Sequence, residues 1–211
     1  MDWKGRLVVV LCLFCAFTGV AVAAGGPLGI DYRLSYDNSG IYKRSYQHDL
    51  IYAMVSGELG GALWFGGKSR LGRTFWQAVD SSALAAGSTF VLKRVFQRTR
   101  PEQENNPDPN KWFQGCCNNL SFPSGEVAGV TSIVTPFILE YHRQQPWIWG
   151  LELLPVYDAE ARMKTWGHWQ TDVLGGFVLG TFTGYLAHER KMPFLLSVLP
   201  HGFMVGLHER F

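Results

Sequence analysis

Long apolar segments rich in glycine and alanine limit what this chain can fold into more than any other feature. Polar or proline-containing stretches separate five of them, at residues 49–67, 71–97, 126–142, 146–164 and 168–190. After residue 23, no stretch reaches eighteen residues without Asp, Glu, Lys or Arg, which favours buried helices over membrane spans. The sequence therefore predicts an all-α bundle of about five to six helices.

Small residues in the last segment leave a second arrangement open. Gly175, Gly176, Gly180 and Gly184 recur at a spacing that lets two helices approach closely, and such spacing also suits helices packed inside a bilayer. A polytopic membrane bundle is thus the alternative to a soluble or peripheral one.

Composition excludes several classes of protein. Of the 211 residues, 47% are hydrophobic and 17% are charged, which excludes a disordered chain. The formal net charge is only +2, so the sequence gives no reason to expect a nucleic-acid partner. We expect one domain over residues 24–211.

The amino terminus has the pattern of an export signal. Lys4 and Arg6 precede an apolar run at 7–20, and small residues follow at 21–24. This pattern predicts a cleaved signal peptide over residues 1–23 and an exported, periplasmic chain, with an uncleaved anchor helix as the alternative. Cleavage leaves only Cys116 and Cys117, which are adjacent and would form a strained disulfide, so we expect two unbridged thiols.

Three stretches outside the apolar segments carry weaker patterns. A turn sequence at residues 37–40 between two tyrosine-containing runs predicts a short hairpin over 31–46. Residues 101–120 predict a polar loop, either a lid that contacts substrate or a disordered crossover. Residues 202–211 predict an edge strand or a tail.

Two clusters of residues suit the binding of an anion. Lys93 lies near the end of one predicted helix, and Arg100 with Pro101 follows on an extended stretch, so two cations can converge there. Ser124 and Gly125 open the next helix: serine suits the N-cap, glycine allows close approach, and the free N–H groups attract an anion.

A third cluster adds a nucleophile. Arg162 is followed after five residues by His168 and after three more by Asp172. Four residues of helix would place His168 and Asp172 on one face, where the carboxylate can orient the imidazole. Each cluster alone also has a purely structural explanation, but the three in this order are far more specific.

The combined pattern resembles the three-part signature of the type 2 phosphatidic acid phosphatase superfamily, which also includes class A bacterial acid phosphatases and vanadium haloperoxidases. The resemblance covers about residues 93–172 and implies an all-α bundle with a phosphate site at the helix ends. It implies catalysis without a metal or other cofactor. His168 would attack phosphorus, and Asp172 would orient it. The implied phosphate-binding residues are Lys93, Arg100, Ser124, Gly125 and Arg162.

The chain departs from this signature at two positions. Ala161 stands where the superfamily usually has serine, and Glu126 stands where a histidine usually protonates the leaving oxygen. We hypothesise that Glu126 is the general acid, which requires burial or the bound phosphate to offset three cations that lower its pKa. Alternatively, His48 or His142 reaches the site, or a good leaving group needs no proton.

Three functions remain open. The first is an exported phosphatase acting on a phosphorylated lipid or lipid-linked carrier at a membrane surface, with Trp166 and Trp169 holding apolar substrate. The second is a soluble periplasmic acid phosphatase acting on a small phosphate ester. The third is a member without turnover that binds phosphate or lipid head groups. Vanadate-dependent halide oxidation is disfavoured because it relies on the histidine that Glu126 replaces. The sequence does not indicate an oligomeric state.

Overall fold

The computed structural model describes residues 25–115 and 120–190 of the chain. The predicted signal peptide, Cys116 and Cys117, and the predicted tail at 202–211 lie outside these residues.

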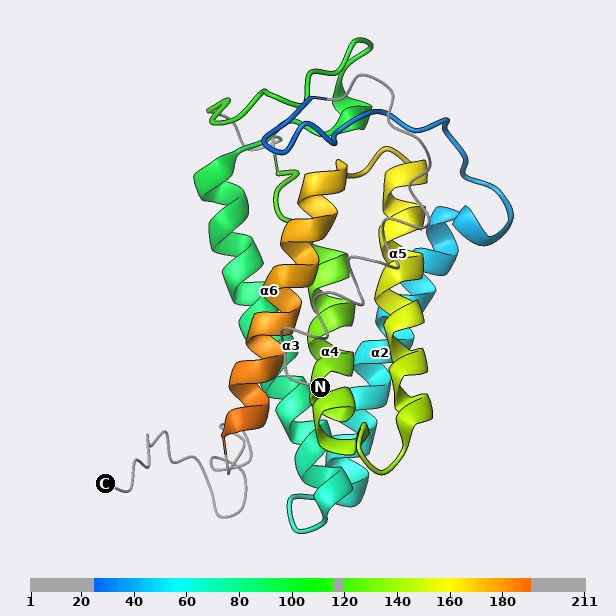
Figure 1. Cartoon of the computed structure of the whole chain (residues 1–211), viewed down its shortest axis with the longest axis vertical. Helices are drawn as coiled ribbons and strands as arrows, with labels where there is room; N and C mark the ends of the chain where they lie inside the picture. The colour runs from blue at the N-terminus through cyan, green and yellow to red at the C-terminus, as the bar shows by residue number, and fades with distance from the viewer. Residues whose placement is uncertain (1–24, 116–119, 191–211) are drawn as a thin grey trace.

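Within the described residues, five α-helices run up and down to form an elongated bundle (Figure 1). Three short 3₁₀ helices occur in the connections, at η1 (Gly40–Tyr42), η2 (Pro101–Gln103) and η3 (Pro146–Glu152). The α-helices are α2 (Arg44–Phe65), α3 (Arg70–Phe96), α4 (Gly125–Tyr141), α5 (Leu153–Lys164) and α6 (Gln170–Glu189). The predicted all-α bundle is confirmed.

Local signals set both ends of α3. Ser69 caps α3 by accepting a hydrogen bond from the Gly72 N–H, and α3 ends before the residues that precede Pro101. Pro136 lies inside α4, as predicted. The segment 146–164 is not one helix, because η3 turns into α5 at Leu153.

The predicted hairpin over residues 31–46 is wrong. The described part of the chain contains no strand there, and the turn sequence instead leads into η1 and α2. Asp37 accepts hydrogen bonds from the N–H and hydroxyl of Ser39. These local bonds form a side-chain turn that closes without a partner strand.

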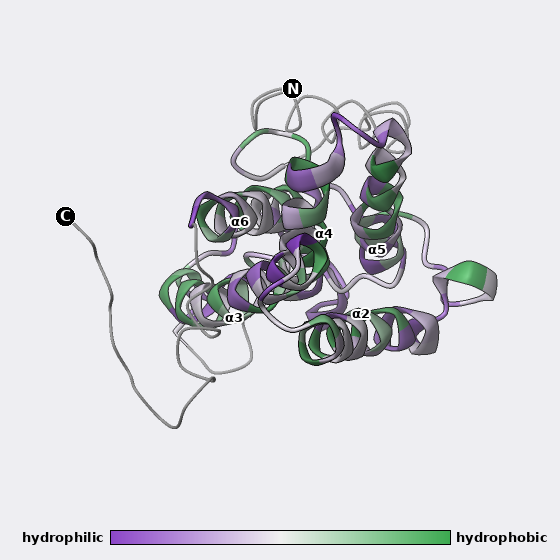
Figure 2. Ribbon diagram, turned by 90° about the horizontal axis from the view of Figure 1, so that it is seen from below, coloured by the Kyte–Doolittle hydropathy of each residue, from purple (hydrophilic) through white to green (hydrophobic). Residues whose placement is uncertain are grey.

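Helix α4 lies in the centre of the bundle (Figure 2), and glycines of α6 let the two helices approach closely. A Cβ at Gly176 would lie 2.7 Å from the Ser124 carbonyl oxygen, and one at Gly180 would lie 2.5 Å from the Ala128 carbonyl oxygen. The predicted close helix contact is therefore made along α4, and it brings the first turns of α4 and α6 together.

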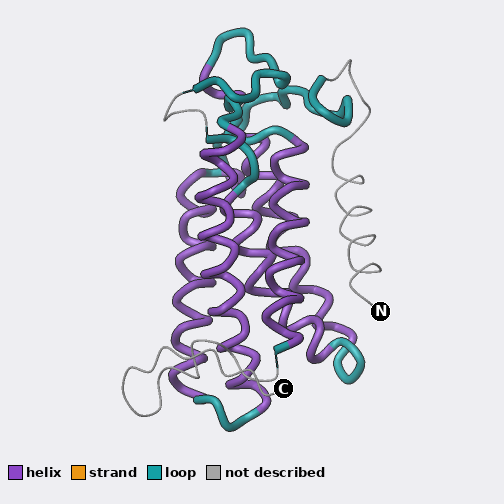
Figure 3. The backbone as a smooth tube through the Cα atoms, turned by 90° about the vertical axis from the view of Figure 1, so that its left-hand side faces the viewer, coloured by secondary structure: helices purple, strands orange, loops and turns teal. Residues whose placement is uncertain are grey.

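The chain direction places unlike helix ends side by side. Helices α4 and α6 begin at the end of the bundle where α3 and α5 finish (Figure 1), and the longer loops gather at that same end (Figure 3). Two helix N-termini, with their positive partial charge, thus converge below the loops. In the described ranges, no helix combines the length and the apolar content needed to cross a bilayer.

Candidate active site

The three sequence clusters meet at the loop end of the bundle. Lys93 lies in the last turn of α3, Arg162 lies in the last turn of α5, and Ser124 immediately precedes α4. Backbone hydrogen bonds join them: the Ser124 N–H donates to the Asp172 carbonyl at 2.9 Å, and the Ser121 N–H donates to the Arg98 carbonyl at 3.0 Å. The predicted placement at the helix ends is therefore observed.

Lys93 is a partly desolvated cation. Burial lowers its pKa to about 7, and the charges of Arg100 and Arg162 act in the same direction. Its ammonium donates to the Leu120 carbonyl at 2.5 Å and to the Ser121 carbonyl at 3.3 Å. An anion bound here would restore the charged form of Lys93.

Ser124 occupies the N-cap position of α4 but does not cap the helix with its side chain. Its hydroxyl is buried and has no hydrogen-bond partner among the described residues. A Cβ on the next residue, Gly125, would lie 3.7 Å from Cε of Lys93. The free hydroxyl and the first N–H groups of α4 can therefore donate to an anion that Lys93 also contacts.

Arg162 is held in place by a glycine that the sequence reasoning did not single out. A Cβ at Gly167 would lie only 2.1 Å from Nη2 of Arg162, so only glycine fits beside the guanidinium. Burial lowers the pKa of Arg162, and its Nε has no hydrogen-bond partner in the described structure. The signal in the sequence was the glycine itself, which stands next to His168, because glycine is common where another group approaches the backbone closely.

His168 is buried, and burial together with the charges of Lys93, Arg162 and Arg100 holds its pKa well below the usual value. The imidazole is therefore neutral near pH 7 and keeps a lone pair for attack. One expectation is wrong: His168 precedes α6 and does not share a helical face with Asp172. Its Nδ1 lies 3.7 Å from Asp172 Oδ2, slightly beyond hydrogen-bond distance.

Asp172 has strong partners of its own. Its Oδ1 accepts from Arg98 Nη1 at 2.6 Å, and its Oδ2 accepts from the Ser121 hydroxyl and from the Trp169 N–H at 2.9 Å. Burial raises the pKa of Asp172, while these donors oppose the rise. Sequence reasoning missed Arg98, because an arginine at this position carries no pattern that points to a distant carboxylate.

Glu126 forms an ion pair with Arg44 of α2. Both terminal nitrogens of Arg44 donate to the two carboxylate oxygens, and Arg162 Nε lies 3.9 Å from Oε2. Burial acts to raise the pKa of Glu126, but the Arg44 hydrogen bonds and the nearby positive charges outweigh it, so the pKa is lowered. Glu126 is therefore a carboxylate without a proton to donate near pH 7. Nothing in the sequence near either residue indicates this pair.

The two alternative histidines lie in different places. His48 is exposed on α2, close enough to Glu126 for its charge to affect that carboxyl. His142 follows the last residue of α4. Since α4 has 17 residues and rises 1.5 Å per residue, His142 lies about 25 Å from the site. His142 cannot protonate a leaving group there.

The two tryptophans beside His168 serve the packing of the protein. Trp169 is buried, and its indole N–H donates to the Thr99 carbonyl at 2.8 Å. Trp166 donates to the Leu34 carbonyl at 2.7 Å, and the Arg33 guanidinium stacks on its ring. Trp169 is therefore enclosed by protein and Trp166 is partly exposed, and a role of the two rings in holding apolar substrate stays a prediction.

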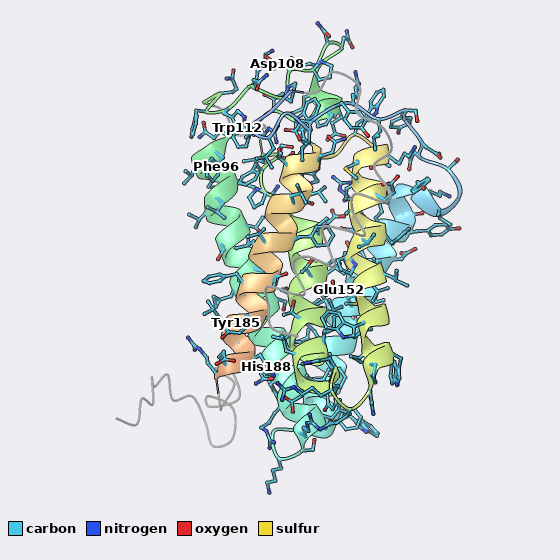
Figure 4. The ribbon with its side chains drawn as sticks, viewed as in Figure 1. Phe96, Asp108, Trp112, Glu152, Tyr185 and His188 are labelled. Atoms are coloured by element: carbon cyan, nitrogen blue, oxygen red, sulfur yellow. The ribbon has the colours of Figure 1, made fainter. Side chains whose placement is uncertain are left out.

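The described part of loop 101–120 packs on the site end of the bundle. The Glu102 N–H donates to the Trp166 carbonyl at 3.1 Å, and the Thr99 N–H donates to the Lys111 carbonyl at 3.2 Å. Trp112 lies near Phe96, with their rings 5.8 Å apart (Figure 4). The described residues of this loop are therefore ordered by contacts with residues close to His168.

The chain is similar to known proteins in its sequence pattern and in its fold. The family model of the PAP2 superfamily matches residues 74–192. No curated protein matches the chain by sequence. The fold is similar to that of LpxE from Aquifex aeolicus, with a TM-score of 0.50 and 22% identity, over 69% of this chain and 85% of that one. A transmembrane PAP2 type phosphatidylglycerolphosphate phosphatase from Bacillus subtilis matches with a TM-score of 0.36 and 17% identity, over 89% and 94% of the two chains.

Proposed function

The chain belongs to the PAP2 superfamily, and on this premise we propose that it is a phosphatase that transfers a phosphoryl group to His168 and then to water, without a metal ion. One observation carries the proposal: a buried neutral histidine lies among three cations at the point where two helix N-termini converge. Neutral imidazole is a nucleophile, and the cations offset the charge of the phosphoryl oxygens.

The first step forms the phosphohistidine. Lys93, Arg100 and Arg162 hold the phosphoryl oxygens, and the free Ser124 hydroxyl donates to one of them. Nδ1 of His168 faces Asp172, so Nε2 attacks phosphorus while the bond to the leaving oxygen breaks. The leaving oxygen departs with the bonding electron pair and, near pH 7, takes its proton from solvent. The imidazole becomes positively charged, and the Asp172 carboxylate stabilises that charge.

The second step releases phosphate. A water molecule attacks phosphorus, the bond from phosphorus to Nε2 breaks, and the electron pair returns to the imidazole. His168 is then neutral again, and the proton lost by water leaves with phosphate or solvent. Because the Arg44 pair keeps Glu126 ionised near pH 7, we propose that Glu126 fixes Arg44 and Arg162 there and donates a proton only under acidic conditions.

Phosphate release by purified protein tests this proposal. The substrates are a water-soluble aryl phosphate, lipid phosphates and lipid diphosphates, across pH 4 to 9, and the variants are His168→Ala and Glu126→Gln. Loss of all release in His168→Ala supports the phosphohistidine. If Glu126 is the general acid, Glu126→Gln loses a rate that rises toward acidic pH. If it only fixes the two arginines, the pH profile keeps its shape while KM rises.

We also propose that the substrate is a phosphorylated lipid and that the exported protein acts at a membrane surface. Support comes from apolar side chains exposed on two adjacent helices, α3 and α6. Exposed apolar side chains gathered on neighbouring helices are typical of a surface that contacts lipid or another protein. The exposed residues are Leu84, Phe90, Val91 and Val95 on α3, and Val178, Phe182 and Leu186 on α6.

Sedimentation with lipid vesicles tests the membrane contact. We expect the wild type to bind vesicles and the variant F90E/F182E to bind them weakly, while both hydrolyse the soluble aryl phosphate equally. Equal turnover of soluble and lipid substrates without vesicle binding would favour the soluble acid phosphatase. Phosphate binding without release from any substrate would identify a binding protein instead.

A further inference from the structure

The segment before α2 forms a strap across the loop that carries His168. This N-terminal strap, residues 25–38, crosses the site end of the bundle near α5 and α6 (Figure 1). The Tyr32 N–H donates to Gln170 Oε1 at 3.0 Å, and Gln170 Nε2 returns a bond of 3.0 Å to the Tyr32 carbonyl. Further along, the Asp37 N–H donates to the Lys164 carbonyl at 3.1 Å.

These hydrogen bonds involve residues on both sides of His168 in the sequence. The Trp166 indole donates to the Leu34 carbonyl at 2.7 Å, so strap contacts occur on both sides of His168, two residues before it and two residues after it. Each contact holds a side chain that lies two residues from His168 in the sequence. The strap therefore limits the motion of the short segment that joins α5 to α6.

Asp31 is the charged anchor of the strap, and it is fully buried. Its Oδ1 accepts from the Thr171 N–H at 2.8 Å, and its Oδ2 accepts from the Thr171 hydroxyl at 2.7 Å and from Arg98 Nη2 at 2.6 Å. The same guanidinium donates through Nη1 to Asp172 at 2.6 Å. Arg98 thus bridges two carboxylates from opposite ends of the chain, and none of the three side chains is exposed.

We propose that Asp31 is a positioning residue for the phosphoryl transfer: through Arg98 and Thr171 it fixes Asp172 and the His168 segment in their reactive arrangement. This inference rests on the proposed function. If Asp172 were the only carboxylate beside the buried Arg98, the two groups together would carry no net charge. With Asp31 taking one edge of the guanidinium, Asp172 retains negative charge to stabilise the imidazolium that forms during attack.

The contacts of Asp31 predict which kinetic constant changes. Asp31 contacts Arg98 and Thr171, whereas the phosphate is held by Lys93, Arg100 and Arg162. Removing the charge of Asp31 should therefore destabilise the transition state more than it weakens substrate binding, so kcat should fall while KM changes little. A role confined to stability would lower the unfolding temperature and leave kcat unchanged.

Asp31→Asn tests the proposal, because the asparagine oxygen can still accept from the Thr171 N–H, while an uncharged NH2 group replaces the carboxylate oxygen that accepts from Arg98. The matched control is Asp37→Asn, which removes the same charge from the same strap outside the Arg98 network. With the soluble aryl phosphate, we expect kcat of Asp31→Asn to fall about ten- to hundredfold with KM within about threefold of the wild type. The control should keep both constants.

The kinetic constants also define the results that would overturn the proposal. Equal kcat in Asp31→Asn and wild type overturns the positioning role and leaves the proposed function intact. No release by the wild type overturns both. If Asp31→Asn does not fold, Thr171→Val replaces it, since it removes only the hydroxyl that bridges Asp31 and Arg98. Unchanged kcat in folded Thr171→Val then overturns the proposal.

Discussion

The protonation state of Lys93 should control how strongly the site binds phosphate. Burial and two neighbouring cations lower its pKa to about 7, so the free protein holds Lys93 half protonated at pH 7. A phosphomonoester, whose second pKa is about 6, is a dianion above that pH. Binding then requires Lys93 to take up a proton, and the apparent affinity falls as the pH rises.

The size of the effect follows from that pKa. The protonated fraction of Lys93 is about one half at pH 7, one eleventh at pH 8 and one hundredth at pH 9. Because the apparent Kd scales with the inverse of the competent fraction, it should rise about fivefold from pH 7 to 8 and about fiftyfold from pH 7 to 9.

Calorimetric binding of an aryl phosphate to His168→Ala measures this without turnover. The comparison is Lys93→Arg in the same background, because arginine stays protonated over this range. We expect the steep rise in Kd only where Lys93 is present. A Kd that changes less than about twofold between pH 7 and 9 with Lys93 in place would refute the reasoning.

Four further substitutions test the packing and the electrostatics of the bundle. Gly167→Ala should displace the Arg162 guanidinium, which would lie 2.1 Å from the new Cβ, and raise KM about tenfold or more; an unchanged KM would contradict this. Gly180→Ala should destabilise the protein by about 1–3 kcal/mol, because its Cβ would meet an α4 carbonyl oxygen at 2.5 Å, whereas Gly87→Ala, with open space around it, should stabilise α3 by up to about 1 kcal/mol. The free energies of unfolding of Gly180→Ala and Gly87→Ala are measured by urea unfolding. Equal changes in the two variants would argue against a close contact between α4 and α6. Burial raises the pKa of Glu58 to about 7 from 4.5, so its contribution to stability is complete below pH 4.5 and is lost as the pH rises through 7; between pH 4 and pH 8 the wild type should lose about 3 kcal/mol more of its free energy of unfolding than Glu58→Gln, which lacks this titration. Parallel unfolding curves for the two proteins at both pH values would show that Glu58 is ionised at no cost.

The ends of α3 could be predicted because they depend on neighbouring residues, whereas α2 begins before residue 49 and α5 begins after residue 146. Ser69 caps α3 at its start, and the helix ends at Phe96, shortly before Arg100, whose helical geometry Pro101 disfavours. The hairpin prediction failed because Asp37 bonds to Ser39, two residues away, and a turn sequence alone does not supply a second strand.

Where the candidate site residues lie was also predictable in outline. The motif residues flank helix ends, so an up-and-down bundle brings them to one end. Their protonation states were not predictable: Lys93, Glu126 and His168 each depend on burial and on charges from other helices.

The sequence by itself determined the helical bundle, the order of the three clusters and the residue types that suit phosphoryl transfer, because each depends on local spacing and side-chain chemistry. Only the tertiary structure decided which charges meet. Asp31 reaches Arg98 across 67 residues, and Arg44 reaches Glu126 across 82. Such pairs leave no periodic pattern in a single sequence, since their partners are brought together by the packing of the helices and the path of the strap.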